Sequence, residues 1–149
     1  MHKVVIPQTE QIDTQTILPC QIDCVGADLR QTNLQGVNLQ NFDLRQADLR
    51  DTNLSGADLR GTNLRGTRIN KNTIFDYKWQ LVWNIANRTA TQSELTGLRL
   101  SAANLSTVNF TKANLNQAFL YQTNLSQSNL SGADLSDTEL TKATLIEAN

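Results

Sequence analysis

Few residues in this chain of 149 residues have the types and spacing that catalysis requires. His2 is the only histidine, and it stands at the second position of the chain. The aspartates recur at one place in a short repeat, so their proximity says little about acid–base chemistry. The phosphate-binding pattern GxxxxGK(S/T) is absent. We therefore predict a non-enzymatic protein with no catalytic residue, no cofactor and no bound metal ion.

The two cysteines, Cys20 and Cys24, allow two interpretations. We expect two reduced thiols in a cytosolic protein, where disulfides are rare. A disulfide or a metal-binding pair is the alternative, but no further Cys or His cluster supports a zinc site. Cys24 lies five residues before Leu29 and should fill an inward position of the repeat described below. Cys20 should lie nearer the surface.

The composition excludes several broad classes of protein. The 13 basic and 14 acidic residues nearly cancel, so the whole chain shows no strong preference for acidic or basic partners. The length favours a single domain spanning residues 1–149. The first residues, MHKVVIPQTEQ, lack a long apolar run, and no segment approaches the roughly 18 apolar residues of a membrane span. We expect a cytoplasmic protein without a membrane partner.

A five-residue repeat organises most of the chain. From residue 27 it runs ADLRQ, TNLQG, VNLQN, FDLRQ and onward, with an apolar residue at each centre and a mostly small residue two positions earlier. The centres expected to form the core are Leu29, Leu34, Leu39, Leu44, Leu49, Leu54, Leu59, Leu64, Leu100, Leu105, Phe110, Leu115, Leu120, Leu125, Leu130 and Leu135.

The period of five excludes the regular secondary structures. In an α-helix a step of five residues advances about 140° past a full turn, so the leucines would scatter around the helix. In a flat strand the side chains alternate, so every second leucine would point to the opposite face. A chain that bends the same way every five residues keeps all leucines on one side and closes into a coil. Stacked coils can pair their backbone groups with one another, which predicts an all-β solenoid.

The tandem pattern A(D/N)LxG resembles the pentapeptide-repeat family. This resemblance implies a right-handed, four-sided parallel β-helix, with leucine at the central inward position and a small residue at the other. The sequence alone leaves the length of a turn open. ADLRQTNLQG at Ala27 recurs as ADLRDTNLSG at Ala47, twenty residues on, and as ADLRGTNLRG at Ala57, ten residues later.

Breaks in the repeat divide the chain into four parts. We expect an N-terminal cap or degenerate coil at 1–21, a first array at 22–74, an insertion at 75–94 and a second array at 95–149. The first phase persists to Ile74, and the 21 residues from there to Leu95 are not a multiple of five. No amphipathic helix follows the second array in the sequence. We expect its end to be exposed or to pair end to end with a second copy of the chain.

The insertion, DYKWQLVWNIANRTATQSE, predicts a short helix near residues 76–88. Asp76 can cap its start, and Trp79 and Trp83 belong to a set with the spacing of one helical face. The favoured interpretation is that the helix packs against a coil or fills a gap. The alternative is a partner-binding helix that uses both tryptophans. The segment DYKWQLVW resembles an insertion in cyanobacterial pentapeptide-repeat proteins.

The outer surface of the first array is rich in charge. Residues 27–71 hold seven basic and five acidic residues, a net charge of +2. Mixed arginine and aspartate ladders are most often solvated and mutually paired. We do not expect nucleic-acid binding, because aromatic interleaving and a strong basic excess are both absent.

Phe119 and Tyr121 break the polar pattern of the second array. They flank Leu120 at positions that should face outward, which makes them candidates for a partner-contact patch. Coverage by the insertion helix is an equally weighted alternative.

Two functions follow as hypotheses. The first is a protein-interaction or structural scaffold with an unidentified protein partner. The second is a DNA-mimicking protein that binds a type II topoisomerase (gyrase), as some members of the resembled family do. The near-neutral charge and the arginines of the first array disfavour the second hypothesis.

Overall fold

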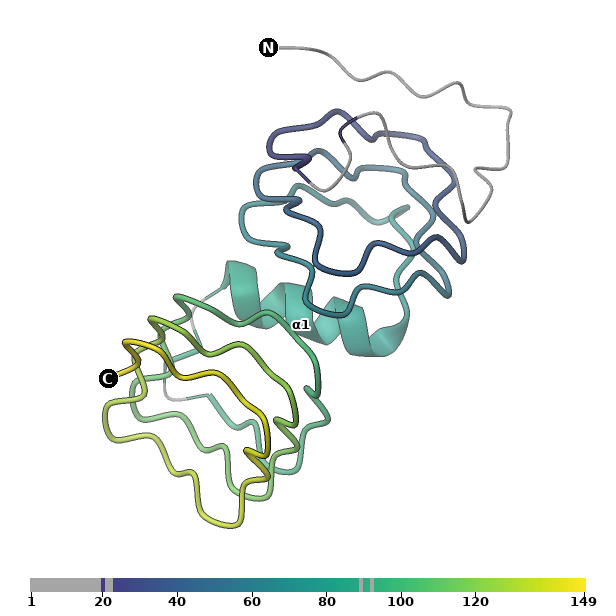
Figure 1. Ribbon diagram of the computed structural model, residues 1–149. Coiled ribbons are helices and arrows are strands. Elements are labelled where there is room, and N and C mark those ends of the chain that lie inside the picture. The colour runs from purple at the N-terminus through teal and green to yellow at the C-terminus, as the bar shows by residue number, and fades with distance from the viewer. Residues whose placement is uncertain (1–19, 21–22, 89, 92) are drawn as a thin grey trace. The chain divides into compact units, whose positions relative to one another are not determined.

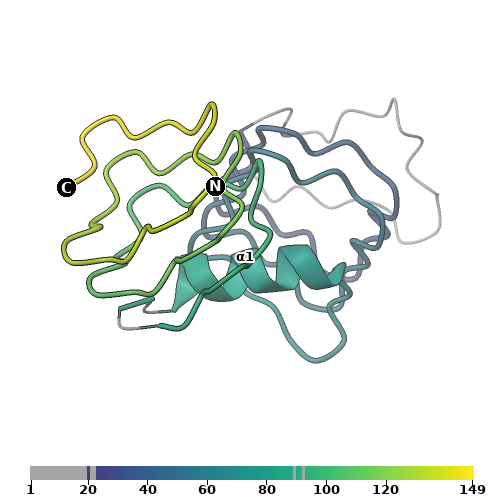
Figure 2. The same cartoon turned by 90° about the horizontal axis from the view of Figure 1, so that it is seen from below.

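The computed structural model describes residue 20 and residues 23–88, 90–91 and 93–149. The chain divides into two compact units, Met1–Gln80 and Leu81–Asn149. In each unit the backbone winds round repeatedly and each coil stacks on the next (Figure 1 and Figure 2). The cap or degenerate coil predicted at 1–21 lies outside the described residues except for Cys20.

Single parallel β-bridges connect the coils. All but one join residues twenty positions apart, from Asp23↔Asp43 in the first unit to Asn124↔Thr144 in the second, and the exception is Asn53↔Ile74. Each coil therefore contains four five-residue segments, which decides between the ten-residue and twenty-residue recurrences of the sequence. In the described residues these bridges are isolated and no longer strand forms. The architecture is a solenoid in which one residue per segment makes the sheet-like contact.

Segment 113–117 shows how each backbone N–H finds an acceptor. The N–H of Ala113 donates to the carbonyl three residues earlier, at 2.8 Å. Those of Asn114 and Leu115 donate to the preceding and following coils, at 2.9 and 2.8 Å. The N–H of Asn116 donates to the side chain of Asn114 at 3.0 Å. The N–H of Gln117 donates to the following coil at 2.9 Å. All five donors are satisfied, as buried backbone requires.

The need to provide an acceptor for every backbone N–H also explains why Asp or Asn precedes most centres. The side-chain oxygen of this residue accepts the N–H two positions later, as in an Asx turn. Asp43 accepts from Arg45 at 3.1 Å, and Asn53 accepts from Ser55 at 3.0 Å. That N–H lies at the bend and reaches neither neighbouring coil. The Asp or Asn is therefore a structural part of each bend.

The centres form the core. Eight in the first array and six in the second are at most 1% exposed. These are Leu29, Leu34, Leu39, Leu44, Leu49, Leu54, Leu59, Leu64, Leu100, Leu105, Phe110, Leu115, Leu120 and Leu125. The small inward residues are often threonines whose hydroxyls donate to a carbonyl of the preceding coil. Thr52 donates to Leu29 at 2.7 Å, which satisfies a hydroxyl that burial would otherwise penalise.

The last coil differs from this expectation. Leu130 and Leu135 were expected in the core but are half-buried, and Leu145 is 41% exposed. The reason is that, within the described residues, no coil stacks on the outer side of residues 130–149. Their side chains face the previous coil on one side only.

The prediction that the first phase persists to Ile74 is wrong. Asn53 bridges to Ile74, 21 residues away, and Ile74 is 51% exposed. The bend at 70–72 contains one extra residue, which turns Ile74 outward and puts Thr73 in the small inward position. The Thr73 hydroxyl donates to the carbonyl of Leu49 at 2.9 Å. The Asn70 side chain accepts the N–H of Asp51 at 3.1 Å and so supports the enlarged bend.

The insertion forms α1, Tyr77–Asn87. Asp76 immediately precedes the helix, and its carboxylate accepts the N–H of Gly56 at 3.1 Å. Trp79, Val82 and Ile85 are its buried residues, whereas Trp83 is half-buried. The buried residues are therefore spaced three apart and differ from the face predicted from the sequence.

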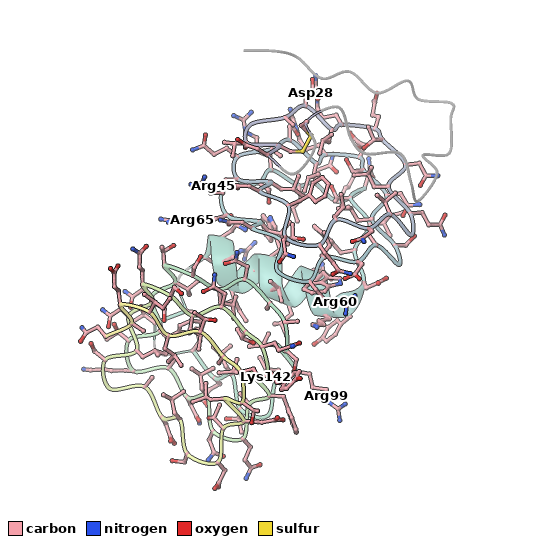
Figure 3. The ribbon with its side chains drawn as sticks, in the orientation of Figure 1. Asp28, Arg45, Arg60, Arg65, Arg99 and Lys142 are labelled. Atoms are coloured by element: carbon pink, nitrogen blue, oxygen red, sulfur yellow. A yellow bond between two sulfur atoms is a disulfide. The ribbon has the colours of Figure 1, made fainter. Side chains whose placement is uncertain are left out.

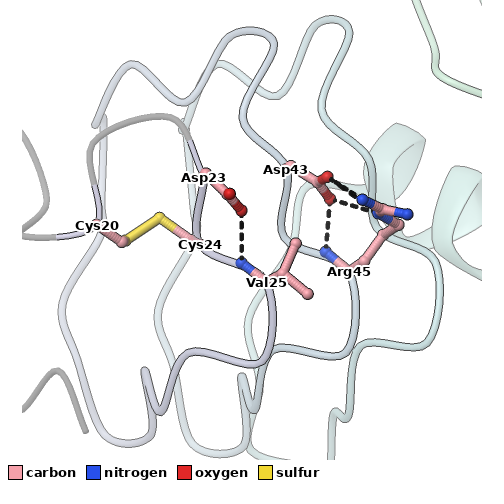
Figure 4. The surroundings of a disulfide bond; sticks show 6 residues. All are labelled: Cys20, Asp23, Cys24, Val25, Asp43 and Arg45. Carbon is pink, nitrogen blue, oxygen red and sulfur yellow. Dashed lines mark hydrogen bonds and ion pairs between the residues drawn. A yellow bond between two sulfur atoms is a disulfide. The ribbon is translucent and has the colours of Figure 1, made fainter. Parts of the chain in front are cut away.

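Cys20 and Cys24 form a disulfide (Figure 4), which corrects the expectation of two free thiols. The N–H of Asp23 donates to the carbonyl of Cys20 at 3.2 Å. The Cα atoms of the two cysteines lie 5.0 Å apart, which is within the range that a disulfide needs. Cys24 is 2% exposed and occupies the inward position.

The last residue of most segments has positive φ, which predicts unequal costs for two alanine substitutions. Gly36 has φ +68° and open space where a Cβ would lie, so Gly36→Ala should cost about 1 kcal/mol of unfolding free energy. Gly61 has φ +70°, and its Cβ would meet the Asn41 side chain. Gly61→Ala should therefore cost more, because Asn41 must also move. Chemical unfolding of both variants checks this, and equal costs would contradict it.

Candidate partner-binding face of the second array

Arginine and aspartate pair on the outer surface of the first unit. Arg30, Arg45, Arg50 and Arg60 each contact the aspartate two residues earlier, with N–O distances of 2.5–2.7 Å. Figure 3 shows Arg45 on one side of this unit and Arg60 on another. Hydrogen bonding from Arg60 lowers the pKa of Asp58 to about 2. The arginines therefore have carboxylate partners on their own segments.

The low pKa of Asp58 predicts a loss of stability in acid. A carboxyl with a depressed folded pKa stabilises the fold above its ordinary pKa of 3.8, and this contribution is lost as pH falls toward about 2. In Asp58→Asn, unfolding free energy should change less over that window than in the wild type. Denaturant unfolding across the window measures the difference. Identical pH dependences would show that Asp58 titrates normally.

The second unit has a different kind of face. The bridges Arg99↔Phe119 and Phe119↔Glu139 place three residues in one column. The Arg99 guanidinium lies 5.4 Å from the centre of the Phe119 ring. The Lys142 ammonium lies 5.4 Å from the Tyr121 ring and donates to its hydroxyl at 3.1 Å. We call these five residues the aromatic face. Arg99 and Lys142 project from the same side of the unit (Figure 3).

The aromatic face departs from the structural rule of the repeat. The three other columns of the second array carry Asp or Asn in at least two of their coils. The column of Arg99, Phe119 and Glu139 carries neither residue in any coil. Its bends therefore lack the Asp or Asn found at most of the other bends. Local departures of this kind are expected where a sequence serves a function.

Exposure separates the predicted contact residues. Phe119 is 41% exposed and Tyr121 is half-buried. The exposed Phe119 ring argues against coverage by the insertion helix. The two tryptophans were the other candidates for partner binding. Trp79 is only 7% exposed, and Trp83 is half-buried. The structure thus brings Phe119 and Tyr121 together on an accessible face, while the two tryptophans lie elsewhere, on α1.

Three members of the aromatic face were not identified from the sequence. Arg99, Glu139 and Lys142 have no unusual spacing along the chain. The missing information was the length of a coil. When the coil is known to contain twenty residues, positions 99, 119 and 139 fall in one column of successive coils. The absence of Asp and Asn from that column can then be seen.

The second half of α1 lies beside the start of the second array. Residues of the helix and of 90–95 line an open cavity of about 400 Å³, whose lining includes Ile85, Arg88, Glu94 and Leu95. In the first half of α1, the Lys78 ammonium lies 4.4 Å from the Trp79 ring, and burial lowers the pKa of Lys78. These contacts favour a packing role for the helix.

Two further properties limit the chemistry of the described residues. No three His, Cys, Asp or Glu side chains in that part of the chain are placed to hold a metal ion. No helix there has the length and hydropathy to cross a membrane.

A family model described as pentapeptide repeats matches residues 23–66, 91–127 and 120–149, with eight copies of the repeat. The match covers well over half of the chain. This chain belongs to the pentapeptide-repeat family. No curated protein matches it.

Solved structures of other pentapeptide-repeat proteins are similar to it. One, from the cyanobacterium Cyanothece 51142, is 24% identical over 85% of this chain and 62% of its own, with a TM-score of 0.36. HetL, from the cyanobacterium Nostoc sp. strain PCC 7120 and involved in heterocyst differentiation regulation, is 26% identical over 83% and 55%, with a TM-score of 0.37. QnrB1, a plasmid-mediated fluoroquinolone resistance protein, is 19% identical over 85% and 69%, with a TM-score of 0.37. The chain spans less than two thirds of the length of the first two.

Proposed function

We propose that this pentapeptide-repeat protein is a non-enzymatic scaffold that binds another protein through the aromatic face of its second array. The observation that carries the proposal is the exposed Phe119 ring, 41% accessible, on a column that lacks the structural Asp or Asn. Contiguous exposed apolar patches mark interaction sites, and Phe119 and Tyr121 lie close together on either side of one centre. Aromatic residues and arginine are also the residues enriched at protein interfaces.

The handedness of the coil is part of the same proposal. Family membership implies a right-handed quadrilateral parallel β-helix, and the four segments per coil and the parallel bridges support four sides. Such a scaffold is rigid, because each coil is hydrogen-bonded to its neighbours at every segment. A rigid face loses little conformational entropy on binding.

Phe119→Ala combined with Tyr121→Ala tests the proposed function. The double variant should keep the fold, because both side chains lie outside the core, and should lose most of the protein captured by the wild type from native lysate. Quantitative mass spectrometry of the captured proteins measures the loss, and circular dichroism checks the fold.

A matched control changes the same segment position on another face. Ser106→Ala combined with Ser126→Ala alters two residues that follow a centre, as Tyr121 does. This control should capture the same proteins as the wild type. If the Phe119/Tyr121 variant also captured them unchanged, the aromatic face would not be the binding surface.

The DNA-mimicking alternative has less support. A mimic needs a row of accessible carboxylates, but Asp28, Asp43, Asp48 and Asp58 are each paired with an arginine. The net charge of −1 shows that the chain has no large excess of acidic residues that would remain unpaired. We expect no effect on supercoiling by gyrase, even at a large molar excess of the protein.

End-to-end pairing of two copies remains a separate proposal. The outer side of coil 130–149 presents the half-buried Leu130, Leu135 and Leu140. A second copy could cover these side chains and pair with the open coil edge, which is a template for further strands. Light scattering during gel filtration would show a dimer, and a monomer at all concentrations would contradict this proposal.

The cellular compartment is also a proposal. The sequence favours the cytoplasm, whereas the Cys20–Cys24 disulfide favours an oxidising compartment. Trapping thiols with an alkylating agent at the moment of lysis separates the two. In the cytoplasm both cysteines should be alkylated, and in an oxidising compartment neither should be.

A further inference from the structure

The two cations of the aromatic face have no carboxylate partner in the part of the chain that the structure describes. Within the described residues, neither Arg99 nor Lys142 forms an ion pair, although Glu139 lies in the same column as Arg99. This differs from the first unit, where Arg45 and Arg60 each pair with an aspartate on the same segment. The aromatic face thus presents cationic groups whose hydrogen-bonding capacity toward an anion is not used by the protein's own carboxylates.

Each of these cations lies beside an aromatic ring. The Arg99 guanidinium is 5.4 Å from the Phe119 ring centre, and the Lys142 ammonium is 5.4 Å from that of Tyr121. Cation–π contacts of this kind restrain long side chains that would otherwise be mobile. A group that packs on the exposed part of Phe119 would therefore bring its neighbouring atoms close to a positioned positive charge. The face offers an apolar contact and anion-binding groups together.

The charge of the face selects between partners. Arg99 and Lys142 against Glu139 give a net charge of +1, whereas the whole chain carries −1. A basic partner would meet two like charges, and an acidic partner would meet two opposite ones. We propose that the aromatic face binds an acidic protein segment that carries an apolar side chain, with its carboxylates at Arg99 and Lys142 and its apolar side chain on Phe119. This inference rests on the proposed function and specifies its partner.

The same observations favour protein over single-stranded nucleic acid. Nucleic-acid binding would need aromatic rings open to base stacking along a continuous positive groove. Here a cation of the chain already lies beside each ring, and the column of Arg99 and Phe119 also contains the carboxylate of Glu139, so it is not a continuous positive surface. Exposed ion pairs are weak and are screened by salt, so the complex should be weak and salt-sensitive.

Fluorescence polarisation with the full chain tests the proposal. The probe is a short labelled peptide with glutamates on both sides of a central leucine. Comparison peptides replace the glutamates by lysines or the leucine by serine, and a labelled single-stranded oligonucleotide of similar length is the fourth ligand. The glutamate–leucine peptide should bind at least about tenfold more tightly than each of the other three, and added salt should weaken it.

Variants place the binding on the face. Arg99→Gln combined with Lys142→Gln should weaken the glutamate–leucine peptide about tenfold, with an unchanged circular dichroism spectrum. Lys112→Gln removes an exposed cation from the same unit but from another column, and it should bind as the wild type does. If Lys112→Gln weakened the peptide by about threefold or more, the loss per charge removed would be as large as in the double variant. The peptide would then sense only net charge, which would overturn the proposal.

The remaining outcomes also decide the question. No binding of the glutamate–leucine peptide, or tighter binding of the lysine peptide or the oligonucleotide, would overturn the acidic-segment proposal. Such results would leave the scaffold function standing if the Phe119/Tyr121 variant still lost its captured proteins from lysate. Unchanged capture by that variant would instead remove the scaffold function itself.

Discussion

Leu115→Asp is expected to prevent the second array from folding. Leu115 is 0% exposed and lies between the coils that contain Leu95 and Leu135. A carboxylate at this position would lie among leucines without an ion-pair partner, and an unpaired buried charge costs several kcal/mol. That cost is comparable with the whole stability of a small protein, which is about 5–15 kcal/mol. Leu59→Asp should have the same effect in the first unit, because Leu59 is also 0% exposed.

Circular dichroism and chemical unfolding of the purified variants measure this effect. Asn109→Asp is the matched control, because it adds the same charge one residue before the buried centre Phe110. Asn109 is exposed, and its side-chain oxygen accepts the N–H of Thr111 at 3.0 Å, which a carboxylate can also do. The control should fold normally. A folded Leu115→Asp protein with a native β spectrum would contradict the inward assignment of the centres.

Phe110→Ala is expected to give the next largest loss of stability. Phe110 is 1% exposed and is the largest fully buried side chain among the described residues. Removing its ring would leave a cavity beside the following coil, to which Phe110 is held by a backbone hydrogen bond of 2.7 Å to Asn129, so the backbone could not simply collapse into the space. Substitutions of this type cost about 3–5 kcal/mol of unfolding free energy.

Phe110→Leu tests whether stability depends on filling the space at this position or on the aromatic ring itself. Leucine occupies the same position in the neighbouring segments at Leu105 and Leu115, so the substitution should cost about 1 kcal/mol. Denaturant unfolding of both variants gives the comparison. Equal and small losses would mean that the ring is not tightly enclosed by its neighbours.

The repeat allowed the burial pattern to be predicted because its physical cause is local. A bend every five residues directs each centre inward, and the Asp or Asn before the centre accepts an N–H only two positions away. Both properties are contained in five consecutive residues. The length of a coil is not contained in five residues, because it depends on which segments pair with one another. The bridges between residues twenty apart supplied that information.

Features that depend on a single extra residue or on contacts between bends were missed. One additional residue at 70–72 reverses the direction of Ile74, and the sequence contains no signal for it beyond the loss of the repeat. Cys20 and Cys24 were expected to remain free because disulfides are rare in the cytosol. Their spacing along the chain did not show that their Cα atoms lie 5.0 Å apart, within bonding distance.

The candidate site was only partly visible in the sequence. Phe119 and Tyr121 could be singled out because aromatic residues are rare in the array. Arg99 and Lys142 could not, since their position beside the rings arises from stacking of three coils. Whether residues 1–149 unfold as one domain stays a prediction, because division into two compact units does not measure cooperativity. A single calorimetric transition would support one domain.

Nuclear Overhauser effects between backbone protons show whether coils of twenty residues stack on one another. Cross-coil contacts are expected between Asn104 and Asn124 and between Asn109 and Asn129, as their bridges require. Runs of helical contacts are expected only at 77–87 among the described residues. Cross-coil contacts between residues ten apart, or helical contacts through 100–125, would contradict this stacking.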